Sequence, residues 1–202
     1  RDWIDDLTTE NPVWVYRLDG HMALANSLAL RAGGVDADSP DVPGGEIVRD
    51  ADGKPTGLLK DNAMNPVFAA VPPPPAERRD RQLRSALEYL AANGVTTVHD
   101  MSNFDSLAVF RRAHASDALT VRIYAAVPLA EWQDLAADIE RNGRGDEMLT
   151  TGALKGFMDG SLGSHTAAML EPFSDAPDDS GMLINTVDDM RTWVTEADAA
   201  GQ

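Results

Sequence analysis

The chain has 202 residues, and its 33 acidic side chains outnumber its 17 basic ones, which gives a formal net charge of -16 at pH 7. This charge disfavours nucleic acids and anionic membranes as partners, because no cationic surface would offset phosphate repulsion. The sequence has no cysteine, which excludes disulfides and thiolate metal ligands, and no apolar run approaches the roughly 20 residues of a membrane helix.

No signal peptide opens the chain, so we expect a cytoplasmic protein. The first residue is Arg1 and not methionine, and we expect a processed or truncated start. The first 75 residues are rich in turns and predict a small β-rich insertion segment. Its predicted elements are a strand at 12–17, a helix at 22–32 and a β-hairpin at 46–59.

Pro72 to Pro75 form a stiff connector, so we place a boundary there, between domains at 1–75 and 76–202. Beyond it, the predicted helices are 76–93, 104–116, 129–142 and 187–200, and the predicted strands are 95–99, 121–127 and 153–158. Strands that alternate with helices on short loops favour parallel βα units, which close as a TIM barrel or open as a doubly wound sheet. A closed barrel takes roughly 250 residues, so we expect an α/β fold that is a partial TIM (β/α)8 barrel, in a fragment of a longer enzyme.

Lys155 is the most informative residue, because it falls in a predicted buried strand and a Gly-rich turn with Asp159 follows at once. A buried ammonium group needs either an ionic partner or a chemical task. Lys155 and Asp159 are four residues apart, so in an extended strand both would face the barrel interior. From the spacing alone, a structural ion pair explains Lys155 equally well.

Several motifs keep a common order over nearly the whole chain. They are Arg17-Leu-Asp-Gly-His21 with Ala25-Asn-Ser27 and Ala29-Leu30 after it, Gly44 to Asp50, Gly53 to Leu58, Gly94 to Asp100, and Leu154 to Ala167. In this combination the sequence resembles amidohydrolase family 3, the YtcJ-like branch of the amidohydrolase superfamily. The resemblance implies a metal-dependent hydrolase on a distorted TIM barrel, with a small β-rich domain beside it.

The resemblance also places Lys155 at the fourth-strand position of that superfamily, where a metal-bridging and often carboxylated lysine occurs. With CO2 the amine becomes a carbamate, an anionic oxygen ligand able to bridge two divalent ions. The implied cofactor is one or two divalent ions, Zn foremost, which lower the pKa of bound water to about 7. The chain lacks the His-x-His pair of the superfamily and its later ligands. We expect no catalytic residue within it, and the general base in a missing C-terminal part.

Candidate substrate contacts lie in the turn before residue 22 and in the loop beyond Lys155. They are His21, Asp159, Ser161, Ser164 and His165. His21 would reach the pocket if the small domain folds over the barrel mouth. The alternatives are a structural His21 held by Asn26 or by the backbone, a tight turn capped by Asp159, and an exposed loop histidine at 165.

Other polar and aromatic residues have simpler interpretations. His99 and Asp100 form a hydrogen-bonded pair at a strand end or belong to the site, and His114 lies on the surface. Trp14, Trp132 and Trp193 fall on apolar faces and are core residues. The acidic stretch 175–179 is a solvated loop and lacks the ligand pattern of a calcium site.

We therefore expect metal-assisted hydrolysis of a carbon–nitrogen bond other than a peptide bond, in a small amide, formamide or cyclic amide. The isolated chain should be inactive, and the full-length protein a homodimer. Two alternatives stay open: a Schiff-base lysine enzyme on a TIM barrel, and a non-catalytic binding module that retains the scaffold. Specificity resides in loops, so the sequence leaves the substrate undefined.

Overall fold

The computed structural model describes residues 1–101 and 103–202, and these form two compact units. The first unit comprises Arg1–Pro72 and Phe157–Val187, and the second comprises Pro73–Gly156 and Asp188–Gln202. The break after Pro72 falls at the start of the polyproline connector. The segment 157–187, which we placed with the barrel, groups with the first unit. The two predicted domains, 1–75 and 76–202, stay a prediction.

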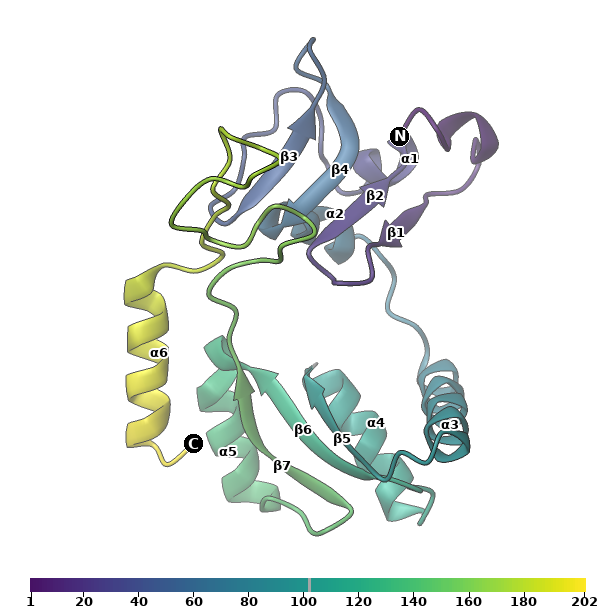
Figure 1. Cartoon of the computed structure of the whole chain (residues 1–202). Helices are drawn as coiled ribbons and strands as arrows, with labels where there is room; N and C mark the ends of the chain where they lie inside the picture. Colours follow the sequence, from purple (N-terminus) through teal and green to yellow (C-terminus); the bar gives the residue numbers. More distant parts are fainter. Residues whose placement is uncertain (102) are drawn as a thin grey trace. The chain divides into compact units, whose positions relative to one another are not determined.

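A four-stranded antiparallel sheet in the order β1-β2-β4-β3 organises the first unit (Figure 1). Its strands are β1 (Trp14–Tyr16), β2 (Met22–Ala25), β3 (Gly45–Arg49) and β4 (Pro55–Asp61). Short helices accompany them: η1 (Asp5–Leu7), α1 (Ser27–Ala32), η2 (Asn62–Met64) and α2 (Asn65–Ala69). The predicted hairpin is confirmed as β3 and β4, and every second residue of β4 is buried, as one packed face requires.

The helix predicted at 22–32 is confirmed only from Ser27 onward, as α1, and is wrong before it. Residues 22–25 form β2, which pairs with β1 on one side and β4 on the other. The helix α1 begins only at Ser27, because the side chain of the preceding Asn26 accepts a hydrogen bond from the Ala29 amide and caps it. Pairing with two strands has overridden a helical spacing of apolar residues, which is a weak local preference.

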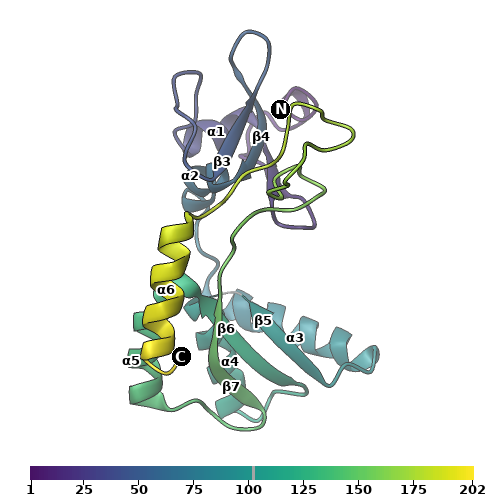
Figure 2. The ribbon, with the colours of Figure 1, turned by 60° about the vertical axis from the view of Figure 1, so that its left-hand side comes forward.

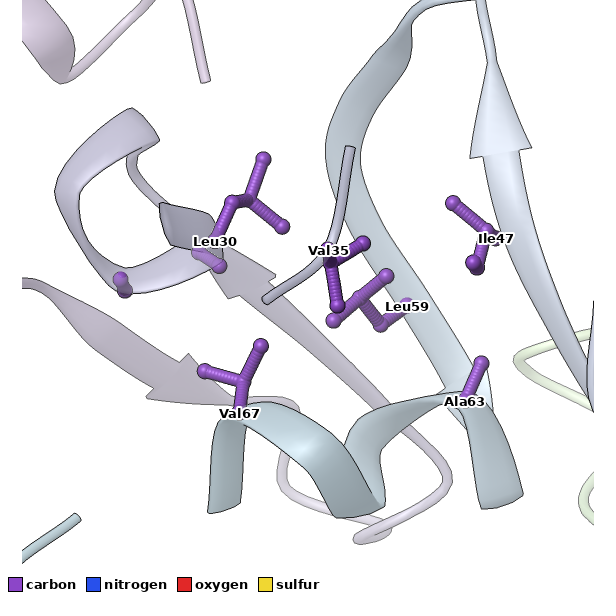
Figure 3. Close-up of a cluster of buried hydrophobic side chains, with 8 residues drawn as sticks. Leu30, Val35, Ile47, Leu59, Ala63 and Val67 are labelled. Atoms are coloured by element: carbon purple, nitrogen blue, oxygen red, sulfur yellow. The ribbon is translucent and has the colours of Figure 1, made fainter. Parts of the chain in front are cut away.

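Buried side chains from strands and helices meet in one core of the first unit. Figure 3 shows Leu30, Ile47, Leu59 and Val67, from α1, β3, β4 and α2, gathered around a common centre. Leu59 is fully buried there. The loop 157–187 lies beside β3 and β4 in both views (Figures 1 and 2), and the Asn62 side chain donates a hydrogen bond to the Ile184 carbonyl at 3.1 Å.

The second unit contains three parallel strands in the order β5-β6-β7. They are β5 (Thr97–Met101), β6 (Arg122–Pro128) and β7 (Leu149–Lys155), accompanied by α3 (Ala76–Ala92), α4 (Phe104–Ala115), η3 (Leu129–Glu131), α5 (Trp132–Asn142) and α6 (Val187–Ala199). Figure 2 shows helices running alongside this sheet. The parallel βα units are therefore confirmed, in a mixed α/β protein.

Two strand predictions need correction. The strand predicted at 153–158 is β7, which begins at Leu149 and ends at Lys155. Lys155 is half-buried at the strand end and not enclosed within the strand. The strand predicted as buried at 95–99 is β5, in which Thr97, His99 and Met101 are exposed, because alternate side chains of a strand point to the same face of the sheet. Among the helices that the structure describes, none combines the length and apolarity that a membrane crossing requires.

Candidate functional site

Lys155 lies at the carboxyl edge of the parallel sheet. It is the last residue of β7, opposite Pro128 at the end of β6. Ligands of α/β proteins with parallel sheets bind at this edge, because the loops that follow the strands gather there. The position of Lys155 in the fold is therefore the one that a functional amine would occupy.

Asp159 does not continue the strand of Lys155, contrary to the prediction, because β7 ends at Lys155. Asp159 belongs to the first unit, where its side-chain oxygen accepts a hydrogen bond from the Ala168 amide at 2.9 Å. It also forms an isolated antiparallel bridge with Leu183. These contacts tie together distant parts of the loop 157–187, and they differ from the tight turn that the sequence left open. Substrate binding by Asp159 stays a prediction.

A row of hydroxyl groups joins the loop beyond Lys155 to the turn 17–21. The Ser161 hydroxyl donates to the Asp19 carboxylate at 2.7 Å and lies 2.7 Å from the Ser164 hydroxyl, which in turn lies 2.8 Å from that of Thr166. Ser164 and Thr166 are buried. Burial alone would raise the pKa of Asp19, but the hydrogen bonds from Ser161 and from the His21 amide, with the charge of Arg17, hold it below its ordinary value. The row therefore acts as a fixed connection within the first unit.

His21 lies against a carboxylate that sequence reasoning missed. Its Nδ1 is 2.6 Å from Oδ1 of Asp61, whose side chain is only 2% exposed, and its own side chain is 16% exposed. The alternative in which Asn26 holds His21 is wrong, since Asn26 bonds to Thr8 and Asn11 instead. The edge of the His21 ring meets Phe157, with the centroids 5.8 Å apart and the planes at 77°.

The pairing of His21 with Asp61 follows from the sheet register. Met22 of β2 is opposite Lys60 of β4, so the next pair outward is His21 and Asp61. The Asp61 amide also donates to the His21 carbonyl at 3.2 Å. The alternation of apolar and polar residues from 55 to 61 was the sequence signal for this strand. It identifies a partner for His21 only when the pairing of β2 with β4 is known.

The remaining histidines are held in different ways. His165 stacks on Phe173 with ring centroids 4.5 Å apart, and its Nε2 lies 3.2 Å from the Asp175 carboxylate, so the loop anchors it. His99 meets the ring of Tyr124 edge-on at 5.3 Å. His114 is partly exposed and lies 3.0 Å from Asp146. Substrate contacts by Ser161, Ser164 and His165 stay predictions.

The donor set of this chain falls short of a metal centre. In residues 1–101 and 103–202, no three histidine or carboxylate side chains lie close enough together to hold an ion. Lys155 is the one residue at a position where the family motif implies a metal ligand. Catalytic zinc sites use three protein ligands. The residues present do not fit a complete site.

One unit with an antiparallel sheet and one unit with parallel βα units make this chain a mixed α/β protein, with Lys155 at the carboxyl end of a parallel strand. The amidohydrolase family model matches residues 1–202. The chain belongs to the amidohydrolase family.

Two curated relatives cover almost the whole chain, and a third covers just over half of it. Protein LONG AFTER FAR-RED 3 of Arabidopsis thaliana is 36% identical over 98% of this chain and 36% of its own length. The putative amidohydrolase YtcJ of Bacillus subtilis is 32% identical over 98% of this chain and 38% of its own. An N-substituted formamide deformylase of Arthrobacter pascens is 38% identical over 56% of this chain and 22% of its own. The chain thus spans between 36% and 38% of the length of the first two relatives.

Solved structures share the fold. An uncharacterized metal-dependent hydrolase from Pyrococcus horikoshii superposes with a TM-score of 0.64 and 24% identity, over 95% of this chain and 38% of that protein. A similarly described protein from Pyrococcus furiosus gives a TM-score of 0.62 and 23% identity, over 97% of this chain and 40% of that protein.

Proposed function

We propose that the chain contributes part of a metal-dependent hydrolase that cleaves a carbon–nitrogen bond other than a peptide bond. The observation that carries the proposal is the family match over residues 1–202, in which Lys155 ends a parallel strand. The similarity to an N-substituted formamide deformylase supports a formamide, small amide or cyclic amide as the substrate class. The net charge of -16 also favours a small molecule over nucleic acid or an anionic membrane.

Lys155 has the central role in this proposal. Its neutral amine attacks the carbon of CO2, a nitrogen–carbon bond forms, and the nitrogen loses a proton to solvent, which leaves a carbamate anion. A carbamate offers oxygen donors that an ammonium group lacks. The cofactor would be one or two divalent ions, Zn foremost, and when bound it supplies a water with a pKa of about 7. The three parallel strands would belong to a partial (β/α)8 barrel, with the other ligands and the general base outside this chain.

The experiment uses the full-length protein. Hydrolysis of a panel of N-substituted formamides, small amides and cyclic amides is measured with and without a chelator, together with the metal content. Lys155→Ala should abolish both activity and metal binding, whereas the control Lys54→Ala, at an exposed turn, should leave both unchanged. Labelling with 13C-bicarbonate should give a carbamate signal that Lys155→Ala removes. Hydrolysis that survives both the chelator and Lys155→Ala would overturn the proposal.

The same experiment separates the two alternatives. A Schiff-base enzyme would be trapped at Lys155 by borohydride in the presence of a carbonyl substrate, and chelation would leave its activity intact. A binding module would show neither turnover nor bound metal in the full-length protein. The binding module is considered because the name of the Arabidopsis relative states no reaction.

A further inference from the structure

The loop 157–187 lies beside β3 and β4 (Figures 1 and 2) without contributing to the hydrophobic core of the first unit. The structure describes every residue of this loop, and none of its apolar side chains is buried. The core cluster around Leu59 is built from residues 14–67 alone. In the loop, Leu162 is 65% exposed and Leu170 is fully exposed. A segment with few buried apolar contacts opens at a lower free energy than the core beside it.

Polar contacts and a close backbone approach hold the loop on the sheet. The Ser161 hydroxyl donates to the Asp19 carboxylate at 2.7 Å, and the Asn62 side chain donates to the Ile184 carbonyl at 3.1 Å. Gly44 lies so near this carbonyl that a Cβ on it would be 2.2 Å from the oxygen. Hydrogen bonds of this kind are replaced by bonds to water when a segment leaves, so each contributes only a modest net stabilisation.

Asp61 opposes the docked position of the loop. Its side chain is only 2% exposed, and Oδ1 lies 2.6 Å from Nδ1 of His21. The other carboxylate oxygen, Oδ2, is buried and has no hydrogen-bond partner in the described residues. A Cβ on Gly160 would be 3.0 Å from Oδ2, so the loop lies directly against this oxygen. A buried carboxylate oxygen without a partner destabilises the closed arrangement, because water would bond to it once the loop moved away.

The backbone of Asp61 is strained at the same place. Its φ of 45° and ψ of -124° lie outside the regions that residues other than glycine favour. The Asp61 amide donates to the His21 carbonyl at 3.2 Å, so strand pairing maintains this conformation. Strained backbone persists only where the surrounding structure imposes it, and it is concentrated at binding sites and switch regions. An unsatisfied charge and a strained backbone therefore coincide in one residue under the loop.

We propose that residues 157–187 form a strap that opens from the sheet of the first unit while the sheet stays folded, and that the Asp61 carboxylate limits how firmly the strap closes. The contacts of Asp19 and Asn62 hold the closed state. The open state returns the Asp61 carboxylate to water and uncovers its pair with His21. The strap belongs to the first unit alone, so its opening does not depend on the reaction proposed above.

The first test is hydrogen exchange of the full-length, unsubstituted protein in increasing urea. The amides of Thr166 and Ile184 are hydrogen-bonded to carbonyls within the strap, whereas β4 is paired within the sheet. The strap amides should exchange at least about 10-fold faster than the most protected amides of β4, and with a weaker dependence on urea, since a local opening exposes less surface. Equal rates with equal urea dependence would mean that strap and sheet open together, and that result overturns the inference.

The second test weakens a contact that closes the strap. Asp19→Asn removes the charge from the acceptor of the Ser161 hydroxyl but keeps an oxygen at that place. Hydrogen bonds to charged acceptors are stronger than those to neutral ones, so exchange in the strap should become about 5–10-fold faster while exchange in β4 stays unchanged. Asp52→Asn, at the exposed turn between β3 and β4, is the matched control and should change neither. Equal acceleration in the strap and in β4 would refute a separate opening.

The third test concerns the opposing residue. Asp61→Asn replaces the buried carboxylate with a neutral amide and keeps an oxygen near His21. Covering a neutral group is less unfavourable than covering a charged one, so exchange in the strap should become about 10-fold slower. Faster exchange in this variant would show that the carboxylate holds the strap closed, and it would overturn the role proposed for Asp61.

Discussion

Asn26 offers a sharp test of how the first unit is held together. Its side chain is fully buried between β2 and α1. The amide oxygen accepts hydrogen bonds from the backbone of Val13 and Ala29, both at 2.9 Å. The amide nitrogen donates to the Asn11 carbonyl at 2.8 Å and to the Thr8 hydroxyl at 2.9 Å. One residue thus caps a helix and fastens the chain that precedes β1.

The expected loss for Asn26→Ala follows from these bonds. These four hydrogen bonds, the shorter ones of the five that the side chain makes, give about 4 kcal/mol at about 1 kcal/mol each. The donors and acceptors left behind are buried or partly buried. Asn103 is the natural comparison, because it also caps a helix but is exposed and accepts one bond, from the Ser106 amide at 3.1 Å. Asn103→Ala should cost about 1 kcal/mol, the usual effect of losing a cap.

Hydrogen exchange measured in increasing urea gives the free energy of opening for each unit separately, so each variant is compared with wild type within its own unit. Asn26→Ala should lower the opening free energy of β2 and α1 by several times the amount that Asn103→Ala lowers that of α4. Equal losses for the two variants would refute the argument that the buried bonds, and not capping alone, set the effect.

Three further substitutions test other contacts. Arg111 donates hydrogen bonds to both carboxylate oxygens of Asp138, at 2.8 and 2.6 Å. The contact with Arg111, and after it the hydrogen bond from Asn142, lowers the pKa of Asp138. The stabilisation of the fold by this ion pair is therefore present above a pH of about 4 and is lost as the pH falls through the folded-state pKa. Asp138→Asn should lower the free energy of unfolding, measured in urea, by about 1–2 kcal/mol at pH 7 and by less at pH 3. An equal loss at both pH values would contradict a stabilising role of the ionised carboxylate. Leu59→Ala, in the core of the first unit, should cost about 2–5 kcal/mol by the same measurement. The new methyl group of Gly160→Ala would overlap the Thr166 side chain, so this variant should lose about 1–3 kcal/mol of stability. Thr166→Ala in the same protein should partly restore it. A Gly160→Ala variant as stable as wild type would contradict the close approach of residue 160 to Thr166.

The parallel half of the fold could be predicted because its signals are local. The helices at 76–92 and 104–115 each present apolar residues at helical spacing, and the short run rich in β-branched residues between them predicts a strand. The start of β7 was missed for a physical reason. Gly152 has φ 137°, and the register with β6 shifts beside it, which is a bulge. A bulge breaks the alternation by which a strand is recognised, so only the residues after it were predicted as strand.

The antiparallel half depended on contacts that no local pattern carries. The strand β2 pairs with β4, which lies beyond α1 and β3 in the chain. Residues 22–32 have helical spacing, and only the two neighbouring strands make the first four of them extended. For this reason Asp61 was absent from the candidate site, although His21 was in it. A one-residue shift of β4 against β2 would move Asp61 to the other face and away from the imidazole.

The contacts of the first unit separate the candidate substrate residues by what remains free on each. The hydroxyls of Ser161 and Ser164 are bonded to neighbours within the unit, and Ser164 is buried. A ligand would have to break those bonds to reach them, whereas His21 keeps a ring nitrogen without a partner in the described residues while a buried carboxylate fixes the other. The serine row therefore shapes the loop that brings Gly160 against Asp61, and His21 is the candidate that a buried carboxylate orients.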